Sequence, residues 1–281
     1  MNAVATASFV VDPANPGQFF AACGLLEIAD RIWRGAEGAF ERRTFRITPT
    51  APALTPLPNI VATLAGGRVD VLKPEKTGSD DEGDAAWPLM LTIGDLMALR
   101  LDWWRDTRSG GKALKVWAGT MHAGRIASAM LAALRSPALH DQNALNIGMV
   151  VANPDDSGKK KEPFYFDARR GAHATARDVG FSPDAVGATT IAYPAVELLC
   201  LVGLQRCRPR TPPRSNGHTS RTFEYFTWTT PLAPPVVNAA AQGHLAGERR
   251  TGYRFENRFR TDQRKHKAFA PGILIEGAEN E

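Results

Sequence analysis

The sequence has little cysteine and no long uninterrupted apolar run. Only three cysteines occur among the 281 residues, and no Cys-x-x-Cys pair is present. Three cysteines cannot form a paired disulfide framework, so we expect a reducing compartment. The first residues lack the basic start and apolar centre of a signal peptide, and no stretch has the roughly 20 apolar residues of a membrane span. The sequence therefore predicts a cytoplasmic protein with no membrane partner.

Motifs that carry catalysis are also missing. Neither H-E-x-x-H nor G-x-S-x-G occurs. The segment 109–113 resembles a phosphate-binding loop, but Asp106 stands where that loop has its first glycine and Ala113 where it has Ser or Thr. The acidic residues at 80–84 and 155–162 lack the spacing of a calcium loop or a metal-dependent nuclease. We expect no catalytic residues, no metal and no cofactor.

Positive charge is concentrated toward the C-terminus. The chain has 43% hydrophobic and 22% charged residues, which is the ordinary globular range. Residues 205–270 contain 13 Lys and Arg against 4 Asp and Glu, whereas the other residues contain 21 against 25. A basic region with interleaved aromatic residues, on a mildly acidic body, indicates a polyanionic partner.

The first fifty residues predict a β-α-β-like start. Residues 7–12 favour a short strand, and 40–47 favour the next one. Between them, Asn15 is a good N-cap, Pro16 suits the first helical position, and Gln18 can reach back as in a capping box.

Apolar patterns predict the remaining elements. Residues 194–206 are apolar nearly all round, so a helix there must be buried. On a helix over 95–104, Trp103 and Trp104 could not both face one core. The other expected elements are two helices or one bent helix over 113–135, and strands at 89–93, 145–151, 164–170, 222–229 and 253–260.

These elements together predict a mixed α+β fold. We expect a β-α-β-like start, central buried helices and a strand-rich basic C-terminal region, without the regular alternation of a doubly wound sheet. Residues 1–206 would form the α+β body. Residues 207–281 would form a basic strand and loop region, packed on the body as one compact unit.

The segment 253–260 is the first candidate for binding nucleic acid. Its aromatic residues alternate with arginines, which places the two kinds on opposite faces of a strand. Guanidinium groups bind phosphates in fork geometry and stack on bases. The alternative is an edge strand whose arginines prevent further pairing. The basic candidates here are Arg254, Arg258, Arg260, Arg264, Lys265 and Lys267.

A second basic stretch, 206–221, is rich in proline and glycine and favours a loop. Arg214 and Asn216 have the chemistry for reading base edges. The alternative is a solvated linker. The candidates in this stretch are Arg208, Arg210, Arg214, Asn216 and Arg221. The set is completed by Lys112, Lys115, Arg169 and Arg170, which lie in two segments with neighbouring aromatic residues.

Four segments in this order resemble a known family. They are Asn15–Asp30, Leu101–Trp104 with Gly110–Gly119, Phe164–Gly171 followed by Asp178–Ser182, and Pro194–Arg206. Together they resemble the short large-subunit family of type I-G (formerly I-U) CRISPR–Cas systems.

The resemblance implies a non-catalytic subunit of an RNA-guided Cascade complex. Such a subunit helps recognise the motif beside the target, stabilises opened DNA and recruits a helicase–nuclease, while base pairing supplies sequence specificity. The implied partners are guide RNA, target DNA, the backbone and guide-end subunits, and the helicase–nuclease. One departure is that the C-terminal region favours strands and basic loops where a large subunit often has a helical bundle.

Two other functions remain open at the level of sequence. A β-α-β start is compatible with an RNA-recognition-like fold, as in endoribonucleases that process guide RNA without metal. Such a site would be built around His218 or His266. The third possibility is a protein-interaction scaffold whose basic residues contact acidic subunits.

Overall fold

Helix α1 (Pro16–Trp33) is buried along almost its whole length and lies in the centre of the protein. In the computed structural model, the described residues are 6–51, 57–73, 87–108, 110–118, 121–171, 191–213, 220–245, 249–260 and 266–275. Within these ranges, no helix combines the length and the apolar composition that crossing a membrane requires.

The start of α1 confirms its predicted N-cap. The side-chain oxygen of Asn15 accepts hydrogen bonds from the N–H groups of Gly17 and Gln18, and Pro16 occupies the first turn. The Gln18 side chain reaches past the N-cap residue, and its Oε1 accepts a 2.6 Å bond from the N–H of Asp12. The cap therefore ties the helix to the chain that precedes it as well as satisfying its first N–H groups.

Helix α6 (Pro194–Arg206) packs against α1 with no side chains between the two backbones at two points. A methyl group added at Gly24 would collide with the carbonyl oxygen of Leu199, and one added at Gly203 would collide with that of Phe20. Residues 194–204 of α6 are all buried, as the apolar pattern predicts. The two helices form the centre around which the sheets are arranged.

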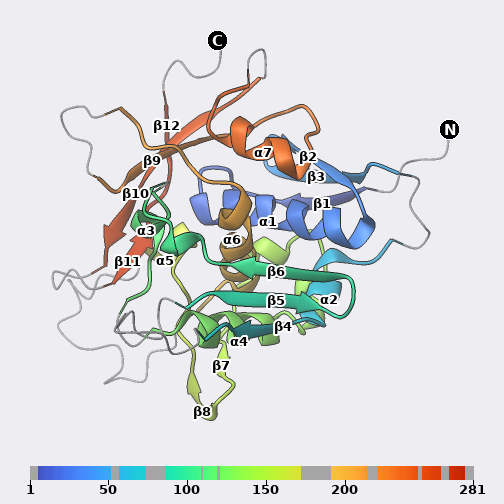
Figure 1. Ribbon diagram of the computed structural model, residues 1–281, viewed down its shortest axis with the longest axis vertical. Coiled ribbons are helices and arrows are strands. Elements are labelled where there is room, and N and C mark those ends of the chain that lie inside the picture. Colours follow the sequence, from blue (N-terminus) through green and yellow to red (C-terminus); the bar gives the residue numbers. More distant parts are fainter. Residues whose placement is uncertain are drawn as a thin grey trace.

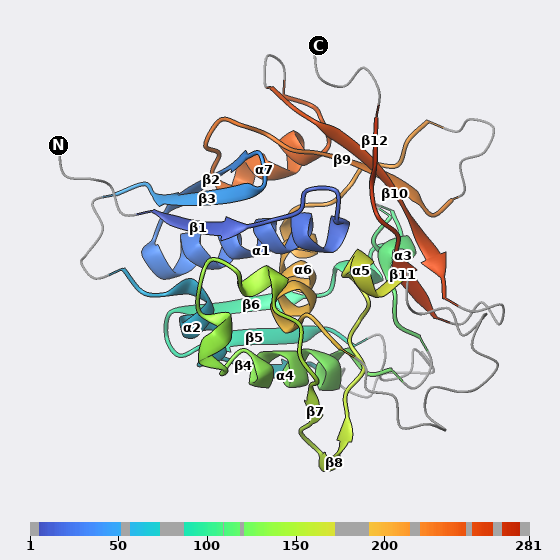
Figure 2. The same cartoon turned by 180° about the vertical axis from the view of Figure 1, so that it is seen from behind.

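The described part of the chain contains four antiparallel sheets, and three of them lie around this helix pair (Figures 1 and 2). The first has the order β1 (Ala7–Val10), β3 (Thr44–Pro49), β2 (Ala36–Glu41). The second consists of β4 (Arg68–Val71), β5 (Leu89–Ile93) and β6 (Met97–Leu101). In the third, β10 (Gly252–Phe259) pairs with β9 (Thr222–Phe226), β11 (Lys267–Phe269) and β12 (Ile273–Leu274). The fourth is the hairpin of β7 (Ala152–Asn153) and β8 (Asp156–Lys160).

Shorter helices complete the architecture, which is the expected mixed α+β class. Both views place α1 between the β1–β3 sheet and the β4–β6 sheet, and the β7–β8 hairpin projects at the end opposite the C-terminus. The remaining helices are α2 (Ile60–Ala65), α3 (Gly111–Leu114), α4 (Ala123–Ala133), α5 (Ala168–Gly171) and α7 (Pro234–Ala241). Short 3₁₀ helices cover Trp103–Arg105, Pro137–Leu139 and Ala144–Asn146.

Aromatic rings connect the C-terminal strands to the body of the protein. The ring of Phe19 in α1 lies 4.3 Å from that of Tyr225 in β9. The ring of Phe40 in β2 lies 4.9 Å from that of Trp228. The Tyr225 hydroxyl donates a 2.7 Å bond to the carbonyl oxygen of Pro13. Residues on both sides of position 206 therefore share one core.

Two further predictions were wrong, because a hairpin turn was missed in one segment and the period-2 pattern of a strand in the other. Residues 40–47 are not one strand but the hairpin of β2 and β3, turning at Arg42 and Arg43. The expected helix at 95–104 contains strand β6, in which Met97, Leu99 and Leu101 are buried and the two residues between them are exposed. This alternation fits a strand with one face on the core.

Two predicted strands in the centre of the chain are also wrong. The segment 145–151 contains the end of a 3₁₀ helix and a single bridge from Met149 to Ala192. The segment 164–170 is irregular before α5, since Tyr165 has a positive φ of 75° that a regular strand excludes. Residues 163–168 are all buried. An irregular segment that is covered on all sides can therefore have the apolar composition from which a strand was predicted.

Both adjacent tryptophans are buried, contrary to the expectation for a regular helix. Trp103 and Trp104 are 0% and 2% exposed. They lie on a 3₁₀ turn, where neighbouring side chains point about 120° apart. Trp103 donates a 3.0 Å bond to the carbonyl oxygen of Leu201 in α6, and the ring of Trp104 lies 5.2 Å from that of Trp117. Protein covers the turn on both sides.

The crossing of α1 and α6 generates a first prediction. Gly203→Ala should lower the free energy of unfolding by roughly 3 kcal/mol, because the added methyl group forces the two backbones apart. Urea denaturation measures this change. Gly66→Ala is the matched control, since its nearest neighbour would be 3.4 Å away, and it should stay within about 1 kcal/mol of the wild type. Equal stabilities for the two variants would contradict direct backbone packing.

Candidate nucleic-acid interface

The structure describes most of the basic residues that the sequence selects. Four of the candidates, Arg214, Asn216, Arg264 and Lys265, lie outside the described residues, and so does the side chain of Arg170. The others fall into two groups: arginines paired with carboxylates in the body of the protein, and cations gathered near one end of β10.

Glu224 holds two of the predicted arginines. This carboxylate is 2% exposed, and it accepts charge-assisted bonds from Arg254 at 2.6 Å and Arg210 at 2.9 Å. The guanidinium of Arg210 also lies 4.6 Å from the centre of the Phe226 ring. A buried carboxylate needs such partners, because the energetic cost of losing its water is high. Both arginines therefore contribute to packing β9 against its neighbours.

Arg208 and Arg169 also pair with carboxylates. Arg208 lies 2.8 Å from Asp106 and is 18% exposed. Arg169 lies 2.6 Å from Asp167, which is fully buried. Its guanidinium also stacks 3.5 Å from the centre of the Tyr193 ring. A role of either arginine in binding nucleic acid stays a prediction, and both have a structural role.

Asp167 belongs to a buried polar network that connects the starts of α1 and α6. Asn15, the N-cap of α1, donates a 3.0 Å bond from its amide to Asp167. Glu197, in the first turn of α6, accepts 3.2 Å bonds from the backbone N–H groups of Phe166 and Asp167. Burial raises the pKa of Glu197 from its ordinary value of 4.5 to about 8, while the backbone N–H bonds oppose this rise.

This raised pKa gives a second prediction. The folded protein holds the Glu197 proton up to a higher pH than the unfolded chain does, so stability should fall between about pH 4.5 and 8. The loss could reach several kcal/mol, at ~1.4 kcal/mol for each unit of pKa shift. Urea unfolding at a series of pH values measures it. Glu197→Gln should flatten this part of the profile, and parallel profiles would contradict the assignment.

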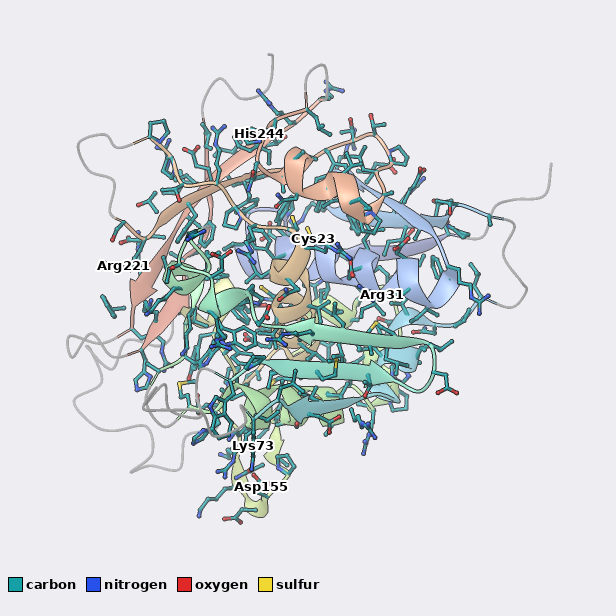
Figure 3. The ribbon with its side chains drawn as sticks, in the orientation of Figure 1. Cys23, Arg31, Lys73, Asp155, Arg221 and His244 are labelled. Atoms are coloured by element: carbon teal, nitrogen blue, oxygen red, sulfur yellow. The ribbon has the colours of Figure 1, made fainter. Side chains whose placement is uncertain are left out.

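The second group of cations forms the β10–β11 cluster, defined by Lys115, Arg221, Arg258, Arg260 and Lys267. Strand β10 confirms the expected alternation over most of its length. Tyr253, Phe255 and Asn257 are buried, while the residues between them lie on the outer face. The pairing of Phe259 with Lys267 then brings β11 beside the end of β10. Arg221 lies at the edge of the protein on this side (Figure 3).

Aromatic rings lie beneath three of these cations. The guanidinium of Arg260 is 3.6 Å from the centre of the Tyr165 ring, and that of Arg221 is 4.7 Å from the centre of the Phe259 ring. The Lys115 ammonium is 5.4 Å from the centre of the Trp117 ring. Cation–π contact of this kind holds the charges in place without neutralising them.

Like charges crowd together in the β10–β11 cluster. Burial, and then the charges of Arg221 and Lys115, lower the pKa of Lys267. Glu256 offsets part of the charge, since it lies 3.0 Å from Arg258 and 3.8 Å from Arg221. Two arginines share this one carboxylate, so the cluster is positively charged. Lys112 in α3 is exposed.

Cys23 and Cys200 are buried. Cys207 is buried as well, and its Sγ lies 3.3 Å from that of Cys23. Burial raises the pKa of the Cys23 and Cys200 thiols, which disfavours the reactive thiolate. The contact between Cys23 and Cys207 joins α1 to the end of α6. The two residues are far apart in the sequence, so the sequence alone does not predict the contact.

The two histidines considered for ribonuclease chemistry differ in position. His218 lies outside the described residues. His266 lies beside the β10–β11 cluster, where its carbonyl oxygen accepts a 2.8 Å bond from the N–H of Arg260. Among the residues that the structure describes, no three His, Cys, Asp or Glu side chains are grouped to hold a metal ion.

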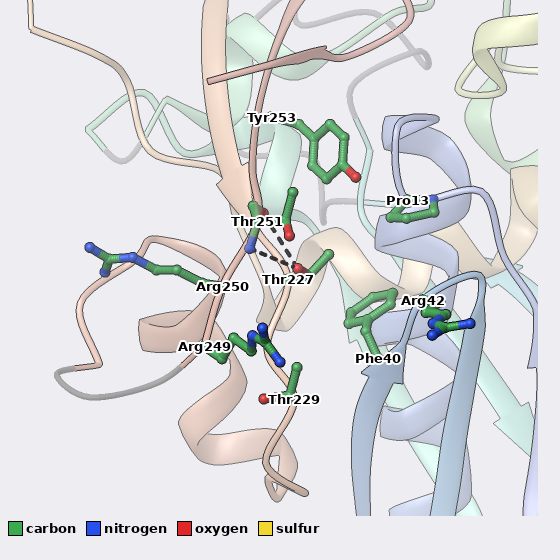
Figure 4. A pocket seen from close by; sticks show the side chains of 9 residues that line it. All are labelled: Pro13, Phe40, Arg42, Thr227, Thr229, Arg249, Arg250, Thr251 and Tyr253. Atoms are coloured by element: carbon green, nitrogen blue, oxygen red, sulfur yellow. Dashed lines mark hydrogen bonds between the residues drawn. The ribbon is translucent and has the colours of Figure 1, made fainter. Parts of the chain in front are cut away.

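Sequence reasoning did not select three arginines that line a cavity of about 440 Å³: Arg42, Arg249 and Arg250 (Figure 4). The signal that could have found them is the pair of arginine dipeptides, Arg42-Arg43 and Arg249-Arg250. Arg42 and Arg43 form a turn, and Arg249 and Arg250 lie outside regular secondary structure. Side chains in such segments need not pack against the core.

Comparisons with protein-family models, with curated proteins and with solved structures find no match to this chain.

Proposed function

We propose that this protein is a non-catalytic, nucleic-acid-binding subunit of an RNA-guided CRISPR surveillance complex. Two arguments support the proposal. The β10–β11 cluster supports binding to a polyanion, and the resemblance of four sequence segments to the short large-subunit family of type I-G systems supports the assembly. Its partners are then guide RNA, target DNA, the backbone and guide-end subunits, and a helicase–nuclease.

The gathering of cations at one end of β10, in the β10–β11 cluster, is the observation that carries the binding part of the proposal. Lys267 lies close enough to Arg221 and Lys115 for their charges to lower its pKa, after the larger effect of burial, so these like charges repel one another. A phosphate backbone beside them removes this repulsion and releases condensed counterions. Aromatic contacts keep the cations oriented before binding, so little side-chain entropy is lost.

Contacts to phosphates position a strand but do not read its sequence. The β10–β11 cluster accordingly supports the stabilising role of the subunit, in which an opened DNA strand or a guide RNA is held in place. Recognition of the target-adjacent motif needs contacts to base edges as well. The resemblance carries that part of the proposal.

Removing two cations of the cluster tests the binding surface. The double variant Lys115→Gln/Lys267→Gln should bind duplex DNA more weakly. Its log–log dependence of affinity on salt should be shallower by up to about 1.8, since each lost phosphate contact contributes about 0.9. Fluorescence anisotropy with labelled DNA at several salt concentrations measures both quantities.

A control variant removes the same charge from another sheet. Arg68 on β4 and Arg100 on β6 are 75% and 56% exposed, and each pairs with an exposed or partly exposed aspartate. Arg68→Gln/Arg100→Gln should leave the salt slope unchanged. Identical slopes for the two double variants would show that binding depends on net charge and not on the β10–β11 cluster.

Recovery of partners tests the assembly. A tagged copy expressed in its native host should retain CRISPR backbone subunits together with small RNAs that carry spacer sequence. Mass spectrometry and RNA sequencing identify both. Retention of neither by a tagged protein that is folded and soluble would refute the assembly, while the salt-dependence experiment would still decide whether nucleic acid binds.

A further inference from the structure

The cavity lined by Arg42, Arg249 and Arg250 lies at the other end of β10 from the β10–β11 cluster. Tyr253 borders the cavity at the start of the strand, whereas Arg258 and Arg260 belong to the cluster at its end. A strand of this length spans roughly 25 Å. The full lining is Pro13, Phe40, Arg42, Thr227, Thr229, Arg249, Arg250, Thr251 and Tyr253. The cavity is therefore a second site, separate from the cluster.

Three parts of the fold meet around this cavity. Arg42 is supplied by the turn between β2 and β3, the threonines at 227 and 229 follow β9, and residues 249–251 precede β10. Figure 4 shows the guanidinium groups of Arg42 and Arg249 on opposite sides of the Phe40 ring. Cations from distant positions in the sequence are thus brought to one opening.

The charge of the lining is wholly positive. Three of the nine described lining residues are arginines, and none of these nine is acidic. Arg250 has a structural role, since its guanidinium donates to the carbonyl oxygen of Gly243 and lies 5.4 Å from the centre of the Phe226 ring. Its side chain extends away from the other lining residues in Figure 4. Arg42 and Arg249 are exposed, and they supply the charge that faces a ligand.

The remaining lining residues combine hydroxyl groups with an apolar floor. Thr227 is held in place, because its Oγ1 accepts a 3.1 Å bond from the N–H of Thr251. Phe40 is 3% exposed and Tyr253 is 9% exposed, and these rings exclude water from one side. A lower local dielectric strengthens the attraction between a guanidinium and an anion.

The backbone at Arg42 is an independent sign of a functional constraint. This residue has φ of 53°, a left-handed conformation that glycine and asparagine adopt more readily. Hairpin turns ordinarily place those residues in such positions. An arginine there costs on the order of 1 kcal/mol, which is consistent with a requirement for its charge.

We propose that this cavity binds the phosphate group of a nucleotide-sized ligand. The guanidinium groups of Arg42 and Arg249 each offer the fork geometry that suits phosphate oxygens. The volume lies within the range of small-molecule sites and is larger than phosphate alone requires. The ligand chemistry has two sources, a free nucleotide or the phosphorylated end of a strand. Only the second of these rests on the proposed function.

Calorimetric titration of the full chain with adenosine monophosphate tests the proposal, with adenosine as the uncharged comparison. The nucleotide should bind and adenosine should not. Arg249→Gln should weaken binding about tenfold or more, as expected for a lost charge-assisted contact. Absence of nucleotide binding at millimolar concentration, or unchanged binding by Arg249→Gln, would overturn the proposal.

Arg42→Gly separates a binding role from a structural one. Glycine relieves the left-handed backbone, so the thermal midpoint should be maintained or raised while nucleotide binding falls. The control is Arg43→Gln, because Arg43 is the adjacent exposed arginine and does not line the cavity. It should bind like the wild type. Loss of binding by both variants would mean that general charge, and not this cavity, attracts the ligand.

A final pair of ligands distinguishes the source of the phosphate. Oligonucleotides with a 5′-phosphate or a 5′-hydroxyl should differ in affinity, in a manner that depends on Arg249, if the cavity receives a strand end. Equal affinities together with Arg249-dependent binding of adenosine monophosphate support a free nucleotide. Neither result depends on the β10–β11 cluster. If the salt-dependence test of the cluster fails, this proposal is unaffected. If the nucleotide titration fails, the proposal for the cluster is unaffected.

Discussion

Helices α1 and α6 touch through backbone atoms, because Gly24 and Gly203 carry no side chain where the two helices cross. Both helices are buried around nearly their whole circumference, so each must be covered by other elements. The sheets provide that cover. Where α1 and α6 begin, Asn15 and Glu197 bind the segment around Asp167 through its side chain and backbone. A change in the helix crossing would therefore displace the aromatic core and both basic sites.

Arginine occupies two different environments in this protein. Around Glu224 and Asp167, arginines compensate buried negative charge and hold strands and loops together. Near the end of β10, cations outnumber the carboxylate that they share and rest on aromatic rings. The first arrangement stabilises the fold, and the second is the surface that we propose to bind a polyanion. A count of arginines along the chain cannot distinguish the two.

Strand β10 connects the two basic sites that we propose. Its buried face packs on the core through Tyr253 and Phe255, which fixes the orientation of its ends. One end borders the cavity of Arg42 and Arg249, and the other carries Arg258 and Arg260. If both sites bind phosphate, a strand held along the cluster and a nucleotide held in the cavity would contact the same rigid element. The two sites nevertheless have no residue in common.

Local patterns in the sequence determined the parts of the structure that depend on neighbouring residues. The N-cap of α1, the buried helix α6 and the alternation along β10 follow from residues within one or two turns or a few strand positions. The mixed α+β class follows from them. The hairpin at Arg42, strand β6 and the irregular segment around Tyr165 were missed, because sheet pairing and burial on all sides decided them. Whether each arginine is paired with a carboxylate also depends on the tertiary structure. Arg254 meets Glu224 across 30 residues and Arg208 meets Asp106 across 102, so only the folded chain determines which charges are paired.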